Sequence, residues 1–279
     1  MFEPLVRSAC FFSLALSLFF PLQNQNNNFF FDPTNKTPTS KFILPKHNPE
    51  DMVLHKEAFS LLYNVKTKQA DWVAYELTLD EVFGTETERS NNFKTDKEVP
   101  LGAANNEDYK KSGYDRGHLA PAADMKFSKT AMEESFLFTN ISPQSPSFNR
   151  GIWSSLEATV RYWAVINEAV LIISGPIFNT EEYLTIGTNF IAIPAAFYKI
   201  ILDYREPEKK GIAFIIPNSK QEKNLLFFVC SIDDVESTTG INFFPLLSPF
   251  EEVLLESTYN TDLWPMIEFS LRKHPYPER

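Results

Sequence analysis

The sequence predicts an α+β fold, in which a mixed or antiparallel sheet of six or more strands is flanked by helices. Apolar runs of strand length recur along the chain and are bounded by Gly, Pro or polar residues. Segments with helical spacing are fewer, so the helices must cover the faces of the sheet. The chain has 279 residues, of which 43% are hydrophobic and 26 are Phe, which is enough for a sizeable core.

The N-terminal segment, residues 1–22, contains Arg7 followed by an apolar run. A basic residue before an apolar run of this length is typical of a signal peptide, so the protein is expected to be secreted or periplasmic. The run at residues 8–22 could instead remain as a membrane anchor, because no clear small-residue cleavage site follows it. Residues 23–52 are rich in Asn, Gln and Pro and are expected to form a polar tether.

One globular domain is expected over residues 53–272, followed by a frayed tail at residues 273–279. Its first two strands are predicted at 59–65 and 71–77, where apolar and polar residues alternate on either side of a polar turn. This pattern favours an antiparallel pair. The polar segment that follows carries Arg89 and reads as a loop.

The second half of the chain supplies further strands. The apolar run 169–176 ends in Gly-Pro and is expected to be a buried strand. Similar runs predict strands at 190–193, 196–202, 211–216 and 225–232. A capping pattern that begins at Ser248 predicts a short helix over 248–255. Asp233 and Asp234 are adjacent at a strand end, where they would point in opposite directions, so a solvated turn is expected there rather than a metal site.

A helix is predicted to begin near Asn149, because Asn149, Trp153 and Glu157 recur at intervals of four and would share one face. Burying the amide and the carboxylate without partners would cost about 1–3 kcal/mol each. Something polar must therefore meet them. An oxygen-rich shell of amide, carboxylate and water is what Mg²⁺ prefers.

The segment before this helix reads Asp115-Arg116-Gly117-His118. Gly117 would let the backbone turn tightly, and the permanent charge of Arg116 would keep the His118 imidazole neutral. A neutral imidazole is the form that a general base needs. The alternative for a lone histidine is a core residue with both ring nitrogens hydrogen-bonded.

Three motifs occur in order: DRGH at 115–118, TNISPQ at 139–144, and NRGIWSSLE at 149–157. This set resembles the DNA/RNA non-specific endonucleases, the family of secreted bacterial nucleases and mitochondrial endonuclease G. The resemblance extends more loosely from about residue 56 to residue 245. It implies the ββα-metal (His-Me finger) fold and a Mg²⁺-dependent hydrolase, with Mn²⁺ or another divalent ion as a substitute.

The resemblance also implies roles for individual residues. His118 would be the general base that activates water. Asn149 would be the one direct protein ligand of the metal, and Glu157 would hold the metal's waters. Asn140 matches an active-site amide of the family, which would orient His118 or a metal-bound water.

Three arginines are assigned to the substrate in the same way. Arg116, the arginine of DRGH, and Arg89 would stabilise the extra negative charge of the transition state. Both would bind the substrate phosphates together with Arg150. Arg89 could instead be an exposed charge on a loop.

The implied substrates are DNA and RNA, cut with little sequence preference. The net charge of −10 argues against a generally basic nucleic-acid surface, because affinity for phosphates rests on Lys and Arg. A local cleft could still attract phosphates. Its candidate members are Arg89, Lys110, Lys111, Arg116, Lys126, Lys129, Arg150 and Arg161.

Two other functions compete with this prediction. The first is a secreted nucleic-acid-binding module on the same fold without turnover. The second is a glycosidase with a carboxylate pair formed by Glu157 and Asp124, which leaves His118 and Asn149 unexplained. The sequence leaves open whether the chain forms a homodimer.

Overall fold

A computed structural model describes residues 44–99, 103–178 and 183–267. The predicted signal or anchor segment, most of the tether and the tail at 273–279 lie outside these residues. In the described part of the chain, no helix is long and apolar enough to cross a membrane.

A seven-stranded sheet, in which every neighbouring pair is antiparallel, forms the centre of the fold. The predicted α+β class with six or more strands is therefore confirmed. The strand order is β1-β2-β3-β6-β9-β10-β11. The strands are β1 (Val53–His55), β2 (Ser60–Asn64), β3 (Gln69–Thr78), β6 (Ala169–Ile177), β9 (Ala196–Asp203), β10 (Lys210–Pro217) and β11 (Val229–Cys230).

Two small ribbons stand apart from this sheet. One pairs β4 (Asp115–His118) with β5 (Ile141–Gln144), and it carries the DRGH motif. The other pairs β7 (Thr185–Ile186) with β8 (Ile191–Ala192). The strand predicted at 190–193 is thus a short member of a separate ribbon and not of the main sheet.

The strand predicted over 225–232 is wrong for most of its length. A 3₁₀ helix (Leu225–Phe228) comes first, β11 has two residues, and α5 (Ile232–Thr239) follows. The side chain of Ser231 accepts the backbone N–H of Asp234, and the carboxylate of Asp234 accepts the N–H of Ser231. This capping box ends the strand and starts a helix. Asp233 and Asp234 are exposed, as expected, but they lie in the first turn of a helix and not in a loop after a strand.

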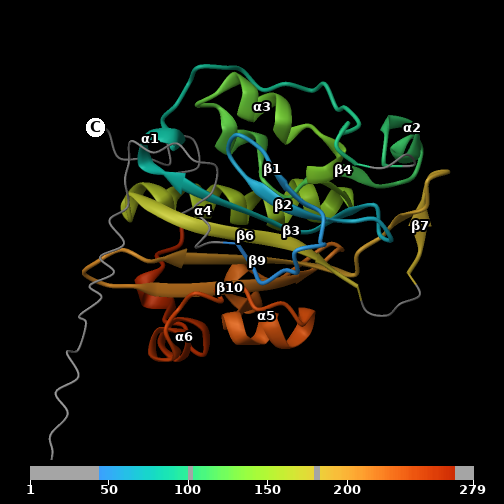
Figure 1. Ribbon diagram of the computed structural model, residues 1–279. Coiled ribbons are helices and arrows are strands. Elements are labelled where there is room, and N and C mark those ends of the chain that lie inside the picture. Colours follow the sequence, from blue (N-terminus) through green and yellow to red (C-terminus); the bar gives the residue numbers. More distant parts are fainter. Residues whose placement is uncertain (1–43, 100–102, 179–182, 268–279) are drawn as a thin grey trace, which may run out of the picture. The chain divides into compact units, whose positions relative to one another are not determined.

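Helices cover both faces of the sheet (Figure 1). On one face lie α3 (Lys129–Ser135) and α4 (Ser154–Ile166), and on the other lie α5 and α6 (Pro249–Glu256). Along β3, Val73 and Tyr75 belong to the core under α3 and α4, whereas Trp72 and Ala74 belong to the core under α5 and α6. This alternation is what a strand buried on both faces requires.

The remaining helices are short. The predicted helix over 248–255 is confirmed by α6, which Ser248 and Glu251 open with a capping box. Other short helical segments are α1 (Leu79–Val82), α2 (Asn106–Tyr109), the π-helical turn Phe148–Trp153 and the 3₁₀ turns Ala122–Met125, Phe138–Asn140 and Thr261–Leu263.

Candidate active site

The β4–β5 ribbon places His118 opposite Ile141 and Gly117 opposite Ser142. The chain continues as a strand through Gly117, so the tight turn predicted there is absent. A Cβ atom on Gly117 would lie 2.1 Å from the side chain of Gln144, which is fully buried. Glycine is needed at this position because of that close approach.

Hydrogen bonds from side chains to its backbone hold the segment that follows His118. Ser174 of β6 donates to the Leu119 carbonyl at 2.8 Å, and Lys199 of β9 donates to the same carbonyl at 3.4 Å. Asn140 accepts the N–H of Ala120 at 2.9 Å and donates to the carbonyls of Ala120 and Ser135 at 2.9 and 2.8 Å. The chain next to His118 is therefore fixed to the main sheet and to the turn before β5.

These bonds engage the oxygen and both N–H groups of the Asn140 amide, which is fully buried. The predicted direct role, in which Asn140 orients His118 or a metal-bound water, has no supporting contact in the described structure. Asn140 instead acts two residues away from His118, through the backbone of Ala120.

The His118 ring is buried among aromatic side chains. Its centroid lies 4.8 Å from that of Phe136, edge to face, and 5.6 Å from that of Phe93. Its Nε2 atom is buried without a hydrogen-bond partner among the described residues. A core histidine with both nitrogens hydrogen-bonded is therefore not what the structure contains.

Burial, and then the charges of Arg89 and Arg116, lower the pKa of His118 to about 3. The imidazole is thus neutral at pH 7, as the sequence predicted. The guanidinium of Arg116 lies 4.2 Å from the centroid of Phe93 and donates to Asn106 at 2.6 Å.

The predicted helix does not begin as an α-helix at Asn149. Residues Phe148–Trp153 form a π-helical turn, with non-helical angles at Gly151 (φ −107°, ψ −111°), and α4 begins at Ser154. Trp153 is consequently turned into the core, 5.1 Å from Phe148 between ring centroids. Counting in fours grouped its indole with Asn149 and Glu157, and this grouping is wrong.

The Asn149 side chain is oriented by Asp115. Its Nδ2 donates to Asp115 Oδ2 at 2.9 Å, and Arg150 donates to both oxygens of the same carboxylate at 2.8 and 2.6 Å. Partial burial raises the pKa of Asp115, but the hydrogen bonds from Arg150 and Asn149 outweigh it and hold that pKa below its usual range. Asn149 also lines the pocket described below, and its Nδ2 is committed to Asp115, so its amide oxygen is the atom that remains available to a ligand.

Glu157 is half-buried and makes no hydrogen bond or ion pair with the described residues. Burial raises the pKa of its carboxyl, and the positive charges of Lys199 and Arg161 partly oppose that rise. Lys199 is itself buried, with its ammonium 4.8 Å from the ring centroid of Trp153. The positive charge of this buried lysine thus acts electrostatically on the Glu157 carboxylate.

Asp124 interacts electrostatically with both Lys199 and Glu157. It accepts from Arg161 at 2.8 Å and from the Tyr75 hydroxyl at 2.8 Å, and it is 1% exposed. Its carboxylate is therefore committed to internal partners.

A pocket of about 340 Å³ brings most of the predicted site residues together. Its lining includes Arg89, Arg116, His118, Asn149, Arg150, Ser154 and Glu157. A neighbouring hollow of about 560 Å³ shares Arg89, Arg116 and Asn149 with it and adds Lys110. The other proposed members of the basic cleft, Lys111, Lys126, Lys129 and Arg161, line neither space.

Sequence reasoning missed Asp115 and Lys199 as site residues. Asp115 is the first residue of the DRGH motif, and its carboxylate next to Arg116 could have indicated a role in the site. Lys199 interrupts the apolar run of β9, and a charged residue within a buried strand requires a buried partner.

The chain is similar in sequence and in structure to known nucleases. A model of the DNA/RNA non-specific endonuclease family matches residues 40–250. The mitochondrial nuclease EXOG of Danio rerio is 34% identical over 222 residues, which are 74% of this chain and 64% of that protein. The chain thus spans slightly under two thirds of that relative's length.

Two further matches cover a larger share of the matched protein. A mitochondrial nuclease of Saccharomyces cerevisiae is 31% identical over 265 residues, 87% of this chain and 80% of that protein. The crystal structure of the EndoG/EndoGI complex, which concerns the mechanism of EndoG inhibition, matches with a TM-score of 0.67. It is 28% identical and covers 71% of this chain and 87% of that chain.

These relatives correct one expectation. The named nucleases of Danio rerio and Saccharomyces cerevisiae are mitochondrial, so the secreted or periplasmic location predicted from residues 1–22 is wrong. An apolar run behind a single basic residue resembles a signal peptide by composition, but composition alone does not specify the compartment. Residues 1–22, with the membrane-anchor alternative, lie outside the described structure.

Proposed function

Because the chain belongs to the DNA/RNA non-specific endonuclease family, we propose that it hydrolyses phosphodiester bonds of DNA and RNA with little sequence preference. One observation carries the proposal. A neutral histidine, three arginines and an amide–carboxylate pair line a single pocket. Base, phosphate-binding charge and metal-binding oxygens are the groups that this reaction needs.

His118 is the proposed general base. Its Nε2 is buried without a hydrogen-bond partner, and Phe93 and Phe136 pack against the ring. We therefore assign uptake of the water proton to Nδ1. A pKa of about 3 is low for a base at neutral pH. A phosphate bound between Arg89 and Arg116 would offset the two charges that depress this pKa, and would raise it toward neutrality when substrate is present.

Arg89 and Arg116 are the proposed phosphate clamp. Arg116 is held by Asn106 and the face of Phe93, and Arg89 lies 5.3 Å from the ring centroid of Phe136. Both guanidinium groups therefore lie against aromatic rings that contact His118. Fixed positive charges in this place stabilise the extra negative charge that develops on the phosphate in the transition state.

Arg150 is the proposed third contact to nucleic acid. Its Nε and one terminal nitrogen bind Asp115, and its side chain is 73% exposed. The guanidinium has further N–H groups that Asp115 does not use, and Arg150 lines the pocket, so these groups are available to a second phosphate.

The oxygens in the pocket fit Mg²⁺, which takes few protein ligands and keeps several waters. Asn149 would hold the ion directly through the oxygen that Asp115 leaves free, and Glu157 would hold it through water. Mn²⁺ or another hard divalent ion suits the same donors. The bound ion would supply positive charge that neutralises the phosphoryl and leaving oxygens.

The structure favours this function over both alternatives. A binding module without turnover needs the arginines but not a neutral, partnerless imidazole among them. A glycosidase needs two accessible carboxyls, whereas Asp124 is 1% exposed and bonded to Arg161 and Tyr75. From the location of its named relatives we further propose that the protein is mitochondrial.

A plasmid-nicking assay with Mg²⁺, repeated in excess chelator and with an RNA substrate, tests the proposal. We expect cleavage of both substrates, loss of cleavage in chelator, and a rate about 10²–10⁴ lower in His118→Ala. The matched control is His47→Ala, because His47 is exposed and outside the pocket. Wild-type nicking by a folded His118→Ala protein, or full activity in chelator, would refute the mechanism.

A further inference from the structure

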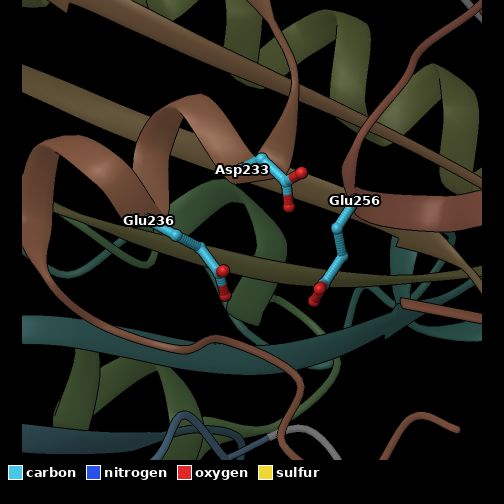
Figure 2. A group of neighbouring side chains, drawn as sticks. All are labelled: Asp233, Glu236 and Glu256. Atoms are coloured by element: carbon cyan, nitrogen blue, oxygen red, sulfur yellow. The ribbon is translucent and has the colours of Figure 1, made fainter. Parts of the chain in front are cut away.

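Three carboxylates converge between α5 and α6, on the face of the sheet opposite the active-site pocket. Asp233 and Glu236 lie on α5, and Glu256 is the last residue of α6. One oxygen of each lies within 4.8 Å of the others. Figure 2 shows the three side chains facing a shared space between the two helices.

The packing of both helices on β10 creates this convergence. A Cβ atom at Gly211 would lie 2.4 Å from the Leu255 carbonyl oxygen and 2.9 Å from Ile232 Cδ1. Leu255 directly precedes Glu256 on α6, and Ile232 directly precedes Asp233 on α5. Both helices therefore contact β10 next to their acidic residues. The Leu255 backbone and the Ile232 side chain thus pack on the same glycine, which brings the ends of α6 and α5 that carry Glu256 and Asp233 together.

Glu256 gives an independent indication of a ligand. Its side chain is 1% exposed, and neither carboxylate oxygen has a hydrogen-bond partner among the described residues. Buried carboxylates are normally paired, hydrogen-bonded or bound to a metal. Burial, and then the neighbouring Glu236, Glu252 and Asp233, raise the pKa of this carboxyl to about 8. A cation in the shared space would remove this conflict.

The other two carboxylates are arranged to complete such a site. Glu236 Oε1 accepts the N–H of Phe243 at 2.7 Å, which fixes the group and leaves its second oxygen for a ligand. Asp234 is used in the cap of α5, whereas Asp233 has no such partner. In the described part of the chain, no Lys or Arg forms an ion pair with any of the three.

We propose that Asp233, Glu236 and Glu256 bind a divalent cation of the calcium type, which clamps α5 to α6. The donors are all oxygens, which selects a hard cation. Ca²⁺ takes about six to eight oxygen ligands in a flexible geometry, whereas Mg²⁺ keeps several waters and is usually held by one or two carboxylates. A group of three carboxylates therefore suits Ca²⁺ better than Mg²⁺. Glu256 also ends α6, where the helix dipole favours a positive charge.

Calorimetric titration and thermal unfolding of the full chain, stripped of metal and then titrated with CaCl₂, test this site. We expect wild type to bind Ca²⁺, with a rise in Tm of about 5–10 °C when Ca²⁺ reaches 100 times its dissociation constant. Asn149→Ala should keep the response, which separates this site from the nuclease pocket. Mg²⁺ should need at least about tenfold higher concentration for the same rise.

Asp233→Asn and Glu256→Gln should abolish the Ca²⁺ response. Glu252→Gln removes the same charge from the same helix outside the three ligands and should keep it. If Glu256→Gln does not fold, Asp233→Asn decides alone, because Asp233 lies at the surface. Absence of Ca²⁺ binding in wild type, an equal response to Mg²⁺, or an unchanged response in Asp233→Asn would overturn the proposal.

Discussion

At the scale of single residues, His118 shows how surroundings select a protonation state. Aromatic rings remove water from one side of the imidazole, and two guanidinium groups oppose a further positive charge. The same arginines would lose this effect once a phosphate lies between them. The histidine is therefore neutral in the free protein and would become more basic when substrate binds.

This arrangement predicts a pH dependence of stability. The pKa of His118 is about 3 in the folded protein, below the value of about 6.5 in the unfolded chain. As the pH falls below 6.5, the unfolded chain takes up a proton that the folded site excludes. The stabilisation is therefore complete above about pH 6.5 and is lost as the pH falls toward 3. The group should contribute up to about 1.4 kcal/mol per pH unit.

Urea unfolding between pH 7 and pH 5 measures this effect. His118→Phe should show a smaller fall in the free energy of unfolding than wild type, because Phe keeps the aromatic packing and cannot titrate. Carboxyls with a raised pKa, such as Glu76, change stability in the opposite direction, so the comparison is made between variants. His47→Ala should follow wild type. A wild-type slope in His118→Phe would show that His118 does not carry the effect.

At the scale of elements, Asp115 joins two segments that are remote in sequence. It lies on β4 and binds Asn149 and Arg150 of the π-helical turn, which are 34 and 35 positions later. Because the turn is not a regular helix, its own backbone does not dictate where Asn149 points. The carboxylate on β4 supplies that orientation.

We therefore expect Asp115→Ala to lower Mg²⁺-dependent nuclease activity about 10–100-fold, the usual effect of losing a group that orients a metal ligand. The Mg²⁺ concentration for half-maximal activity should rise at the same time. Arg150→Ala leaves the bond between Asn149 and Asp115 in place and should keep the wild-type Mg²⁺ requirement. Plasmid nicking across a Mg²⁺ series checks both. An unchanged Mg²⁺ requirement in Asp115→Ala would contradict the orienting role.

Elements with a continuous apolar pattern were predictable from sequence. The runs at 196–202 and 211–216 became β9 and β10, because strands buried on both faces need apolar residues throughout. The apolar run at 225–232 has the same pattern, but most of it does not form a strand. Leu226 and Phe227 are 48% and 66% exposed, and the capping box at Ser231 starts a helix. Local hydrogen bonding there prevails over hydrophobic pattern.

The site likewise has some features that were predictable from sequence and others that were not. Motif order identified His118, Asn149 and Glu157, and all three line one pocket. The hydrogen bonds between the Asn140 side chain and the backbone of Ala120 could not be predicted, because the two residues are 20 positions apart in the sequence. The π-helical turn was also missed, since counting residues in fours presumes an α-helix. Gly151 within the helical pattern was the available warning.

At the scale of the whole molecule, the sheet separates two regions of opposite charge. The pocket side gathers Arg89, Arg116 and Arg150, and the opposite face carries the acidic cluster between α5 and α6. A net charge of −10 is thus compatible with a substrate that is itself a polyanion, because attraction depends on the local field at the pocket.

This distribution predicts a steep but limited dependence of DNA binding on salt. If three arginines each neutralise one phosphate of a duplex, affinity should fall about 40-fold between 50 and 200 mM salt, because the released counterions compete for the phosphates. Fluorescence anisotropy of a labelled duplex in chelator, where cleavage is suppressed, measures this slope. Arg116→Ala should reduce the logarithmic slope by about 1. Lys129→Ala is the matched control, because Lys129 is exposed and lines neither space of the site. An equal loss of slope in Lys129→Ala would mean that cations spread over the surface hold the duplex. A slope near zero in wild type would mean that the arginines of the pocket do not.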